Sequence, residues 1–138
     1  MSKRIYLAAP IHKEHDSKVN AELLKGLRAN GYDVWSPQEA GIASEIAKKT
    51  GRALDDVRAE FLKKDLSAMK TCDICLAYID RDEGMSEGML WEMGWFTGMN
   101  RLVLWFNPRN IKTTLMVQFT ADFICREFAE LLEVLKSV

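Results

Sequence analysis

The sequence predicts a single α/β domain: a doubly wound, three-layer sandwich with a mainly parallel sheet of four to five strands. Two observations predict it. Short apolar runs rich in Ile, Leu, Val and aromatic residues alternate with longer segments of helical periodicity. A chain of 138 residues also suits one domain, residues 1–138, that buries enough surface to fold without a metal or a disulfide.

The first half of the chain is expected to hold two strands and three helices. Apolar runs at 4–9 and 32–35 each stop near a proline, which lacks the backbone donor that a strand ladder needs. Between them, apolar residues at helical spacing predict a helix over 16–30 that an Asn-Gly pair closes. A small, polar stretch follows with a short helix near 42–49, and a longer amphipathic helix is expected over 54–69.

The second half is expected to hold two strands and three helices. The near-continuous apolar run over 73–79 is typical of a strand buried on both faces of a parallel sheet. An acidic loop leads from it into a helix over 86–99, and a strand over 101–106 ends at an Asn-Pro turn. A short helix is expected near 114, and the periodicity of 123–135 predicts a final helix.

Composition narrows the class of partner. Nineteen basic residues nearly balance 20 acidic ones, and the basic residues are scattered, so no nucleic-acid polymer is expected. No apolar run is long enough for a bilayer span or a secretory signal, and an odd count of three cysteines indicates reduced thiols, so we expect a cytoplasmic protein without a membrane partner. Cys72 and Cys75 form a C-x-x-C that we interpret as two buried thiols on opposite faces of a strand.

One acidic residue stands out because its helix has no polar face. Residues 84–96 are rich in Met, Trp and Gly, and Glu92 lies among them. A carboxylate in such a helix is unfavourable unless it is paired, hydrogen-bonded or protonated, which makes Glu92 a site candidate. The alternative is an ion pair with a core Arg or Lys. Gly88 and Gly94 favour a site, because a glycine within a helix indicates a close approach by a ligand or a neighbouring strand.

Four motifs follow one another in the chain: Ile5-Tyr6-Leu7-Ala8-Ala9-Pro10, Lys64-Asp65-Leu66, Cys72-Asp73-Ile74, and Gly88 through Glu92 to Gly94. Their succession resembles nucleoside 2-deoxyribosyltransferases and the related deoxynucleoside 5′-monophosphate N-glycosidases over nearly the whole chain. The resemblance implies a flavodoxin-like fold, no metal and no cofactor. It also implies a 2′-deoxynucleoside or nucleotide and a free nucleobase as ligands, and a homo-oligomer, at least a dimer, with shared sites.

The resemblance assigns catalytic roles to three residues. Glu92 is the implied nucleophile: it attacks the anomeric carbon, and a base or water resolves the covalent intermediate with net retention. Tyr6 is implied to orient Glu92, and Asp65 to face the sugar and base and to help move a proton to the leaving base. The alternatives are a core strand tyrosine and a helix-surface acid.

The remaining expected site residues bind substrate. The loop after the first strand is expected to line the base pocket, although His12 is otherwise an exposed loop histidine. Gln38 stands where some transferases read the base edge. The expected substrate-binding set is Ala8, Pro10, Ile11, His12, Gln38, Ser86, Gly88 and Met89, with Thr114 and Met116 contributed by a neighbouring subunit.

Two departures from the family pattern leave the substrate open. Ser86 stands where many transferases carry an acid; a serine there helps bind a 5′-phosphate in the glycosidases, but serine is also a good helix N-cap. Glu87 could supply the displaced carboxylate and repel phosphate, and the acidic loop 80–83 also disfavours a dianionic ligand. Thr114 stands where family members carry an asparagine or serine that holds the 5′ group of the sugar. It keeps a hydroxyl donor but lacks the amide of asparagine.

Four functions remain on these grounds. Transfer of deoxyribose between bases ranks first, ahead of hydrolysis of a deoxynucleoside monophosphate. A non-catalytic nucleotide-binding module and a scaffold that uses the Met- and Trp-rich helix as a partner surface are the alternatives from other classes. Replacing Glu92 by Ala separates them, since it should abolish turnover in an enzyme and merely perturb affinity in a binding protein.

Overall fold

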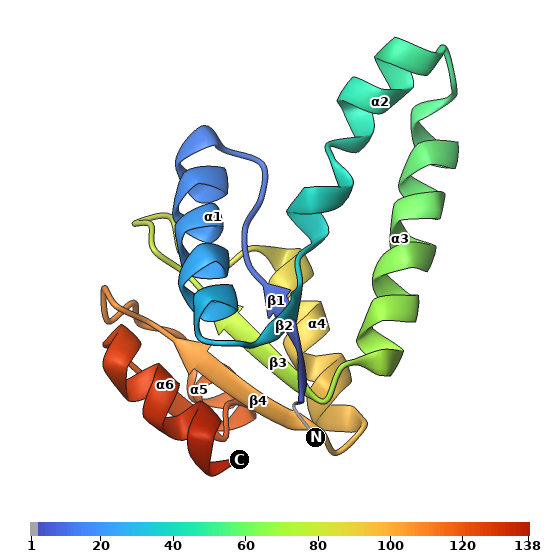
Figure 1. The fold of residues 1–138 in the computed structure, drawn as a ribbon. Coiled ribbons are helices and arrows are strands. Elements are labelled where there is room, and N and C mark those ends of the chain that lie inside the picture. The colour runs from blue at the N-terminus through green and yellow to red at the C-terminus, as the bar shows by residue number, and fades with distance from the viewer. Residues whose placement is uncertain (1–2) are drawn as a thin grey trace.

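A computed structural model describes residues 3–138 (Figure 1). The elements in chain order are β1 (Arg4–Ala8), α1 (Glu14–Ala29), β2 (Asp33–Trp35), the 3-10 helix η1 (Pro37–Ala40), α2 (Ala43–Thr50), α3 (Leu54–Thr71), β3 (Ile74–Tyr78), α4 (Glu87–Gly98), β4 (Leu102–Phe106), α5 (Leu115–Thr120), β5 (Phe123–Cys125) and α6 (Phe128–Ser137). Within these residues, no helix is both long enough and apolar enough to cross a bilayer.

The five strands form one parallel sheet in the order β2-β1-β3-β4-β5. The fold class predicted from the alternation of strands and helices is therefore confirmed. The strand order changes direction between β1 and β3. In a doubly wound sheet, ligands bind beside this reversal, outside the carboxyl ends of the strands. The segments that follow β1 and β3 are therefore the first place to look for a site.

Alternation along the strands separates two apolar cores. Ile5 and Leu7 of β1 pack on one face with α1 and α6, while Tyr6 and Ala8 pack on the other face with α3 and α4. All four side chains are 1% exposed or less. Figure 1 shows the same layering, with α1 and α6 on the near side of the sheet and α4 behind it. Tyr6 is therefore directed toward α4 by its place in β1.

Helices α2 and α3 form an arm that projects from the sheet (Figure 1). In α3, buried side chains occur near each end: Val57 beside α2, and Ala68 and Met69 where the helix reaches the sheet. Residues between these two ends lie along the side of the arm. Leu62, with 53% of its surface exposed, is one of them.

Two expectations from the sequence are wrong in detail. Phe123–Cys125 is a strand and the last helix begins only at Phe128. The pairing with β4 outweighs the helical pattern there, and the Asp122 carboxylate accepts a hydrogen bond from the Val103 backbone nitrogen at 2.8 Å. Cys72 ends α3 rather than lying on a strand, so it packs in the same core as Cys75 instead of on the opposite face. Both thiols are buried, as predicted.

Candidate active site

Glu92 lies on the inward side of α4, and helical spacing explains why. Met89, Met93 and Phe96 are the buried residues of this helix, and Glu92 falls between them at three- and four-residue spacing. Ser86 caps the helix, with its hydroxyl oxygen accepting a hydrogen bond from the Met89 backbone nitrogen at 3.3 Å. The packing of the methionines and the phenylalanine thus carries a carboxyl group into an apolar layer.

The Tyr6 hydroxyl donates a hydrogen bond to the Glu92 carboxylate. Tyr6 is fully buried and its ring packs 5.8 Å from that of Phe96. Burial, followed by the negative charge of Glu92, raises the pKa of Tyr6 well above its usual value. The phenol therefore stays protonated and acts as a fixed donor to one carboxylate oxygen of Glu92.

The environment of Glu92 disfavours its ionised form. Burial raises the pKa of Glu92 to about 7; the hydrogen bond from Tyr6 opposes this shift and the nearby Asp65 adds to it. Within residues 3–138, no Lys, Arg or His forms an ion pair with Glu92. The alternative interpretation of Glu92 as half of a core ion pair is therefore contradicted.

Asp65 approaches Glu92 from the arm. It precedes Met69, which is 1% exposed, by one helical turn of α3. Burial raises the pKa of Asp65 to about 6, and the indole N–H of Trp35 partly opposes the shift. That N–H is buried and lies near the Asp65 carboxylate, but no hydrogen bond of ordinary geometry joins the two groups. Asp65 and Glu92 are thus two acids, on two helices, that are both protonated more easily than usual.

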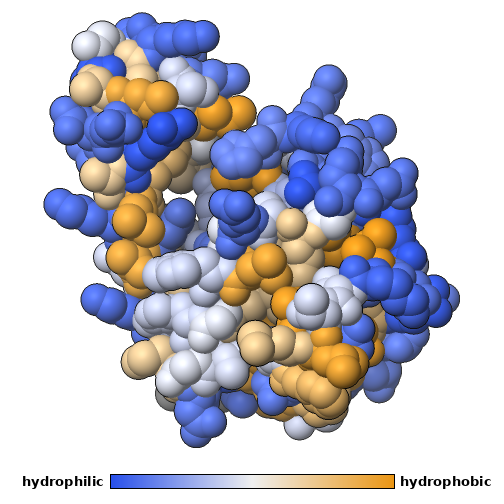
Figure 2. Space-filling model, turned by 180° about the vertical axis from the view of Figure 1, so that it is seen from behind, coloured by the Kyte–Doolittle hydropathy of each residue, from blue (hydrophilic) through white to orange (hydrophobic). Residues whose placement is uncertain are grey.

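A cavity of about 470 Å³ opens between α3, α4 and the segment after β1. Figure 2 shows a hollow between the arm and the rest of the molecule. The cavity volume lies within the usual range for small-molecule sites. Its lining residues are Ala9, Ile11, His12, Pro37, Leu62, Asp65, Met69, Ser86, Glu87, Gly88, Met89, Trp91 and Glu92.

The charged side chains of the cavity are mostly acidic. Asp65, Glu87 and Glu92 line it, whereas no Lys or Arg among the described residues does; His12 is the one basic side chain. Phosphate sites in proteins are generally built from Arg, Lys or clustered backbone N–H groups. The cavity therefore favours an uncharged ligand.

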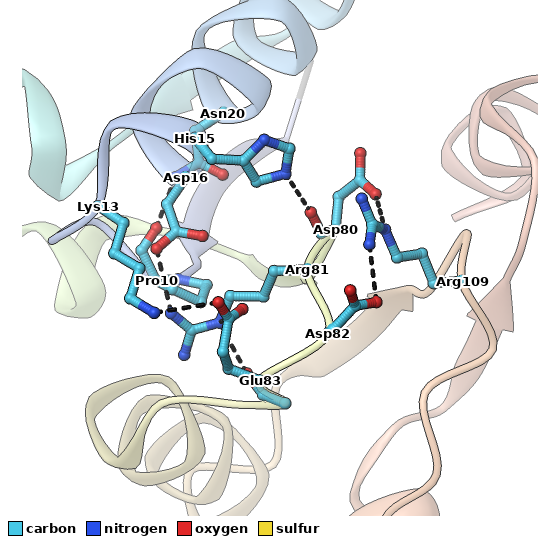
Figure 3. Close-up of polar contacts among 11 residues, drawn as sticks. Pro10, Lys13, His15, Asp16, Asn20, Asp80, Arg81, Asp82, Glu83 and Arg109 are labelled. Atoms are coloured by element: carbon cyan, nitrogen blue, oxygen red, sulfur yellow. Dashed lines mark hydrogen bonds and ion pairs between the residues drawn. The ribbon is translucent and has the colours of Figure 1, made fainter.

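The acidic loop after β3 is neutralised by basic neighbours (Figure 3). Arg109 bonds to Asp80 at 2.7 Å and to Asp82 at 2.9 Å, and Lys13 bonds to Glu83 at 3.0 Å. The expectation that this loop repels a dianionic ligand through its own charge is thus weakened. Instead, its acids form ion pairs with Lys13 and Arg109, and these pairs hold the loop to the segments that follow β1 and β4.

A more deeply placed pair anchors the same loop. Arg81 bonds to Asp16 at 3.1 Å, and their side chains are 13% and 4% exposed. Arg81 Nε also donates to the carbonyl of Gly84, whose φ of +82° suits glycine. Figure 3 shows these contacts bridging the start of α1 and the loop. Because α4 begins at Glu87, three residues after Gly84, the pair positions the cavity wall at Ser86.

The structure brings most of the predicted site residues together, but not all of them. Ile11, His12, Asp65, Ser86, Gly88, Met89 and Glu92 line the cavity, and Tyr6 lies behind Glu92. Ala8 and Pro10 are buried instead of lining it. Thr114 and Met116 are exposed at the start of α5 and do not line this chain's cavity, so their predicted role in a neighbouring subunit's site stays a prediction.

Gln38 is held in place by the protein itself. Its Oε1 accepts a hydrogen bond from Asn20 at 3.0 Å and its Nε2 donates to the Ser17 carbonyl at 3.0 Å. Asn20 is 2% exposed and also donates to the carbonyl of Pro10 at 2.8 Å. Gln38 does not line the cavity, so its predicted contact with the base also remains a prediction. Asn20 was missed in the sequence, although it interrupts the apolar stripe of α1.

Several cavity residues had no signal in the sequence. Leu62 on α3 and Trp91 on α4 are each 53% exposed, and they line the same cavity only because the fold places the two helices on either side of it. Met69 is likewise an ordinary helix residue until the fold places it, whereas Ala9 and Pro37 belong to the loops after the first two strands, where the sequence predicts ligand-binding segments. Among the described residues, no group of three His, Cys, Asp or Glu side chains is arranged to hold a metal ion.

Comparison with known proteins agrees with this fold. The family model described as nucleoside 2-deoxyribosyltransferase matches residues 5–127. A solved structure of 2-deoxyribosyltransferase from Bacillus psychrosaccharolyticus is 24% identical with a TM-score of 0.76, covering 93% of this chain and 89% of its own. A conserved protein from Enterococcus faecalis is 18% identical with a TM-score of 0.79, covering 99% of both chains.

The CMP N-glycosidase of Clostridium botulinum is also similar, at 20% identity and a TM-score of 0.55, with 97% of this chain and 99% of that chain covered. No curated protein sequence matches the chain significantly. Likeness at these identities shows the fold alone, but the family model spans most of the chain. On that match, the chain belongs to the nucleoside 2-deoxyribosyltransferase family.

Proposed function

We propose that this chain is a nucleoside 2-deoxyribosyltransferase that exchanges the base of a 2′-deoxyribonucleoside through a covalent deoxyribosyl–Glu92 intermediate. The observation that carries the proposal is the pair of acids in the cavity. Glu92 is desolvated, is held by the Tyr6 hydroxyl, and has a pKa near 7 beside Asp65, whose pKa is near 6. Two carboxyl groups with different neighbours can serve as nucleophile and as acid.

In the first half-reaction, the ionised carboxylate of Glu92 attacks the anomeric carbon while the bond to the base breaks. The departing base takes the bonding electrons and receives a proton from the carboxylic acid of Asp65. Tyr6 keeps one oxygen of Glu92 occupied, which leaves the other free to attack. The products are an ester between Glu92 and the sugar, a free base and an Asp65 carboxylate.

In the second half-reaction, a second base enters and attacks the same carbon from the opposite side. Asp65 now accepts the proton that the incoming base loses, and the ester bond to Glu92 breaks to release its carboxylate. Two inversions give net retention at the anomeric carbon. The apolar lining from Ile11, Met89 and Trp91 supports this function, because it limits access by water, which would otherwise hydrolyse the ester.

A second candidate is hydrolysis of a deoxynucleoside 5′-monophosphate. One observation favours it: Ser86 lines the cavity, and while its oxygen accepts a bond from Met89, its hydroxyl proton remains free to be donated to a phosphate. The lack of Lys and Arg in the lining, among the described residues, weighs against it. The similarity in fold to the CMP N-glycosidase is a second reason to test this candidate.

Product analysis separates the two enzymes from a binding protein. The protein is incubated with deoxyinosine plus adenine, and separately with deoxy-AMP alone, and the products are followed by chromatography. New deoxyadenosine is the result we expect; adenine released from deoxy-AMP alone would instead indicate the hydrolase. Glu92→Gln serves as the inactive control. Absence of both products over a panel of bases and nucleotides would favour a non-catalytic nucleotide-binding module.

A further inference from the structure

We propose that Trp35 is a positioning residue for Asp65: its indole N–H directs the Asp65 carboxyl group and stabilises that group when it is ionised. Tyr6 has the corresponding role for Glu92. The importance of Trp35 for catalysis rests on the proposed function, in which Asp65 gives a proton to the leaving base. The contact between the two side chains does not depend on that function and can be tested without turnover.

The sheet places Trp35 beside Tyr6. The two residues are Cα partners in the parallel pairing of β2 with β1, so their side chains leave the same face of the sheet. Both pack in the apolar core that this face forms with α3 and α4. Each carries one hydrogen-bond donor on its ring, and the Tyr6 hydroxyl donates to Glu92. The same row of the sheet thus presents a second donor to the layer that holds both acids.

The Trp35 donor is buried, and the acceptor near it is the Asp65 carboxylate. A buried N–H group that finds no acceptor destabilises a protein, so a bond between these two groups is favoured. The last torsion of an aspartate side chain has a broad energy minimum. A small rotation of the Asp65 carboxyl group therefore brings the pair to ordinary hydrogen-bond geometry.

Contacts on another side fix the ring of Trp35. The guanidinium group of Arg4 lies over it, 5.9 Å from the ring centroid. Arg4 also donates to the Thr71 hydroxyl at 2.7 Å and lies 3.2 Å from the Asp33 carboxylate, which ties it to the end of α3 and to β2. The indole N–H is thus held in one place before any ligand enters.

Asp65 faces acids rather than cations. Glu87 and Glu92 of α4 line the same cavity, together with His12 after β1, and Tyr6 lies behind Glu92. No Lys or Arg within residues 3–138 lines the cavity. Burial raises the pKa of Asp65 to about 6, and the indole N–H from β2 opposes this rise. That donor therefore helps to keep Asp65 acidic enough to protonate a leaving base.

The bond is strongest once Asp65 has lost its proton, because an N–H group bonds more strongly to a carboxylate than to a neutral acid. In the first half-reaction, the proton of Asp65 moves to the departing base and leaves a carboxylate behind. The indole N–H stabilises this charge as it develops, more than it stabilises the starting state. Trp35 should therefore affect the rate of the reaction more than the binding of substrate.

NMR titration of the Asp65 carboxyl carbon tests the contact without turnover. In Glu92→Gln, Asp65 titrates without its coupled partner. Adding Trp35→Phe keeps an aromatic ring and removes the donor, so it should raise the pKa of Asp65 by roughly half a unit or more. Trp105 provides the matched control, because its indole N–H on β4 is also buried without an acceptor. Trp105→Phe should leave the pKa of Asp65 unchanged.

The wild type gives a second measurement that does not depend on how a Trp35 variant folds. The indole proton signal of Trp35 should move downfield as Asp65 ionises, and this movement should be absent in Asp65→Asn. An indole signal that does not respond to the ionisation of Asp65 overturns the proposal. An unchanged pKa of Asp65 in folded Trp35→Phe does the same, and neither result affects the role of Glu92.

Kinetics separate positioning from a purely structural role. With deoxyinosine and adenine, Trp35→Phe should lower kcat about tenfold, leave KM nearly unchanged and move the pH optimum to a higher value. Unchanged kcat, or a change confined to KM, would count against the catalytic role. If the wild type exchanges no base while the NMR signals respond as expected, the transferase proposal fails and the contact between Trp35 and Asp65 stands.

Discussion

Glu92 and Asp65 are carboxyl groups placed where the ionised form is poorly solvated, with pKa values near 7 and near 6. Their charges also interact, so protons leave the pair in two steps that belong to both residues together. Tyr6 adds one fixed hydrogen bond and cannot titrate in the range where the acids do. The chemistry of the site therefore depends on how two protons are shared at neutral pH.

The pH dependence of kcat/KM follows from these values. Catalysis requires Glu92 to be ionised and Asp65 to be protonated, and because Glu92 has the higher pKa this is the less populated of the two forms that carry one proton. Its population still peaks between pH 6 and pH 7, so activity should fall below about pH 6 and above about pH 7. Initial rates of base exchange from pH 5 to 8.5 would show this bell. Asp65→Asn should be slower and should lose the decline at high pH. A profile that stays flat through pH 6 and 7 would contradict the assignment of both acids.

The same shift predicts that Glu92 lowers stability at neutral and higher pH. Its folded-state pKa of about 7 lies above the ordinary value of 4.5, so the folded protein favours the protonated form. The resulting stabilisation is present below pH 4.5 and is lost as the pH rises through 7. Glu92→Gln keeps the shape and cannot ionise, so it should be more stable than the wild type at pH 8 by about 3 kcal/mol.

Urea unfolding at pH 5 and pH 8 would measure this difference. The advantage of Glu92→Gln should be large at pH 8 and should fall to less than about 1 kcal/mol at pH 5. Glu45→Gln, a change on the exposed surface of α2, should track the wild type at both pH values. A Glu92→Gln protein that is less stable at pH 8 would mean that the ionised carboxylate has a favourable partner. Gains of this kind are common when an active-site charge is removed.

The sequence allowed Glu92 to be found by physical reasoning, because a charged residue in an apolar helix needs an explanation. Tyr6 and Asp65 needed the family resemblance, since a strand tyrosine and a helix aspartate are common. Asn20 and Asp16 carried an overlooked signal: both are polar residues on the buried stripe of α1. Trp91 had no local signal, because its place in the cavity depends on where the arm passes.

At the scale of elements, the loop between β3 and α4 is held by one buried ion pair. Arg81 and Asp16 join it to the start of α1, and Gly84 supplies the backbone turn. Both charges are largely removed from water, so each needs the other. The exposed pairs around them add less, because solvent screens them.

Breaking this pair should be costly in a way that breaking an exposed pair is not. Asp16→Asn removes the buried partner of Arg81 and leaves only the longer contact to the half-exposed Glu83 at 3.9 Å, so we expect a loss of about 3 kcal/mol in the free energy of unfolding. KM should also rise more than kcat falls, because the loop leads into the cavity wall. Asp82, whose side chain is 91% exposed, provides the control: Asp82→Asn should lose less than about 1 kcal/mol.

A double variant tests whether the two residues act together. Combining Asp16→Asn with Arg81→Met should lose less stability than the sum of the two single changes, because the second change removes the stranded charge. Additive losses in urea unfolding would show that the two side chains act independently.

Element boundaries were predicted well where local patterns were strong, as in α1, α3 and β3. The last helix shows the limit. Residues 123–135 have helical periodicity, yet Phe123–Cys125 pair with β4 as a strand. The strand pairs with β4, about 20 positions earlier in the chain, and the sequence of residues 123–135 by itself contains no sign of that distant partner. Such a contact overrides local propensity.

At the scale of the whole molecule, apolar side chains remain exposed on α4, α5 and β5. Figure 2, which shows the molecule from behind the view of Figure 1, has hydrophobic side chains gathered on its lower part. Met116 and Phe119 are each 82% exposed, and Trp91 is 53% exposed. We expect a homo-oligomer, at least a dimer, as predicted from the sequence, because such side chains commonly mark an interface.

Charged substitutions on this face test the expectation. Phe119→Asp should reduce the mass measured by light scattering at micromolar concentration and should lower activity, since Thr114 and Met116 of α5 are expected to serve a neighbouring site. Ala129→Asp adds the same charge to an exposed position of α6, on the other side of the sheet, and should change neither. A wild type that is monomeric and fully active would contradict the shared site.

The arm has a mechanical consequence. Asp65 stands near the base of a long projecting helix, whereas Glu92 stands on a helix packed over the sheet. Small bending movements of α3 would therefore alter the distance between Asp65 and a base held over Glu92, which is the distance that the transferred proton must cross. Raising the solvent viscosity with glycerol or sucrose should slow these movements and therefore slow turnover, while the pH optimum should stay unchanged.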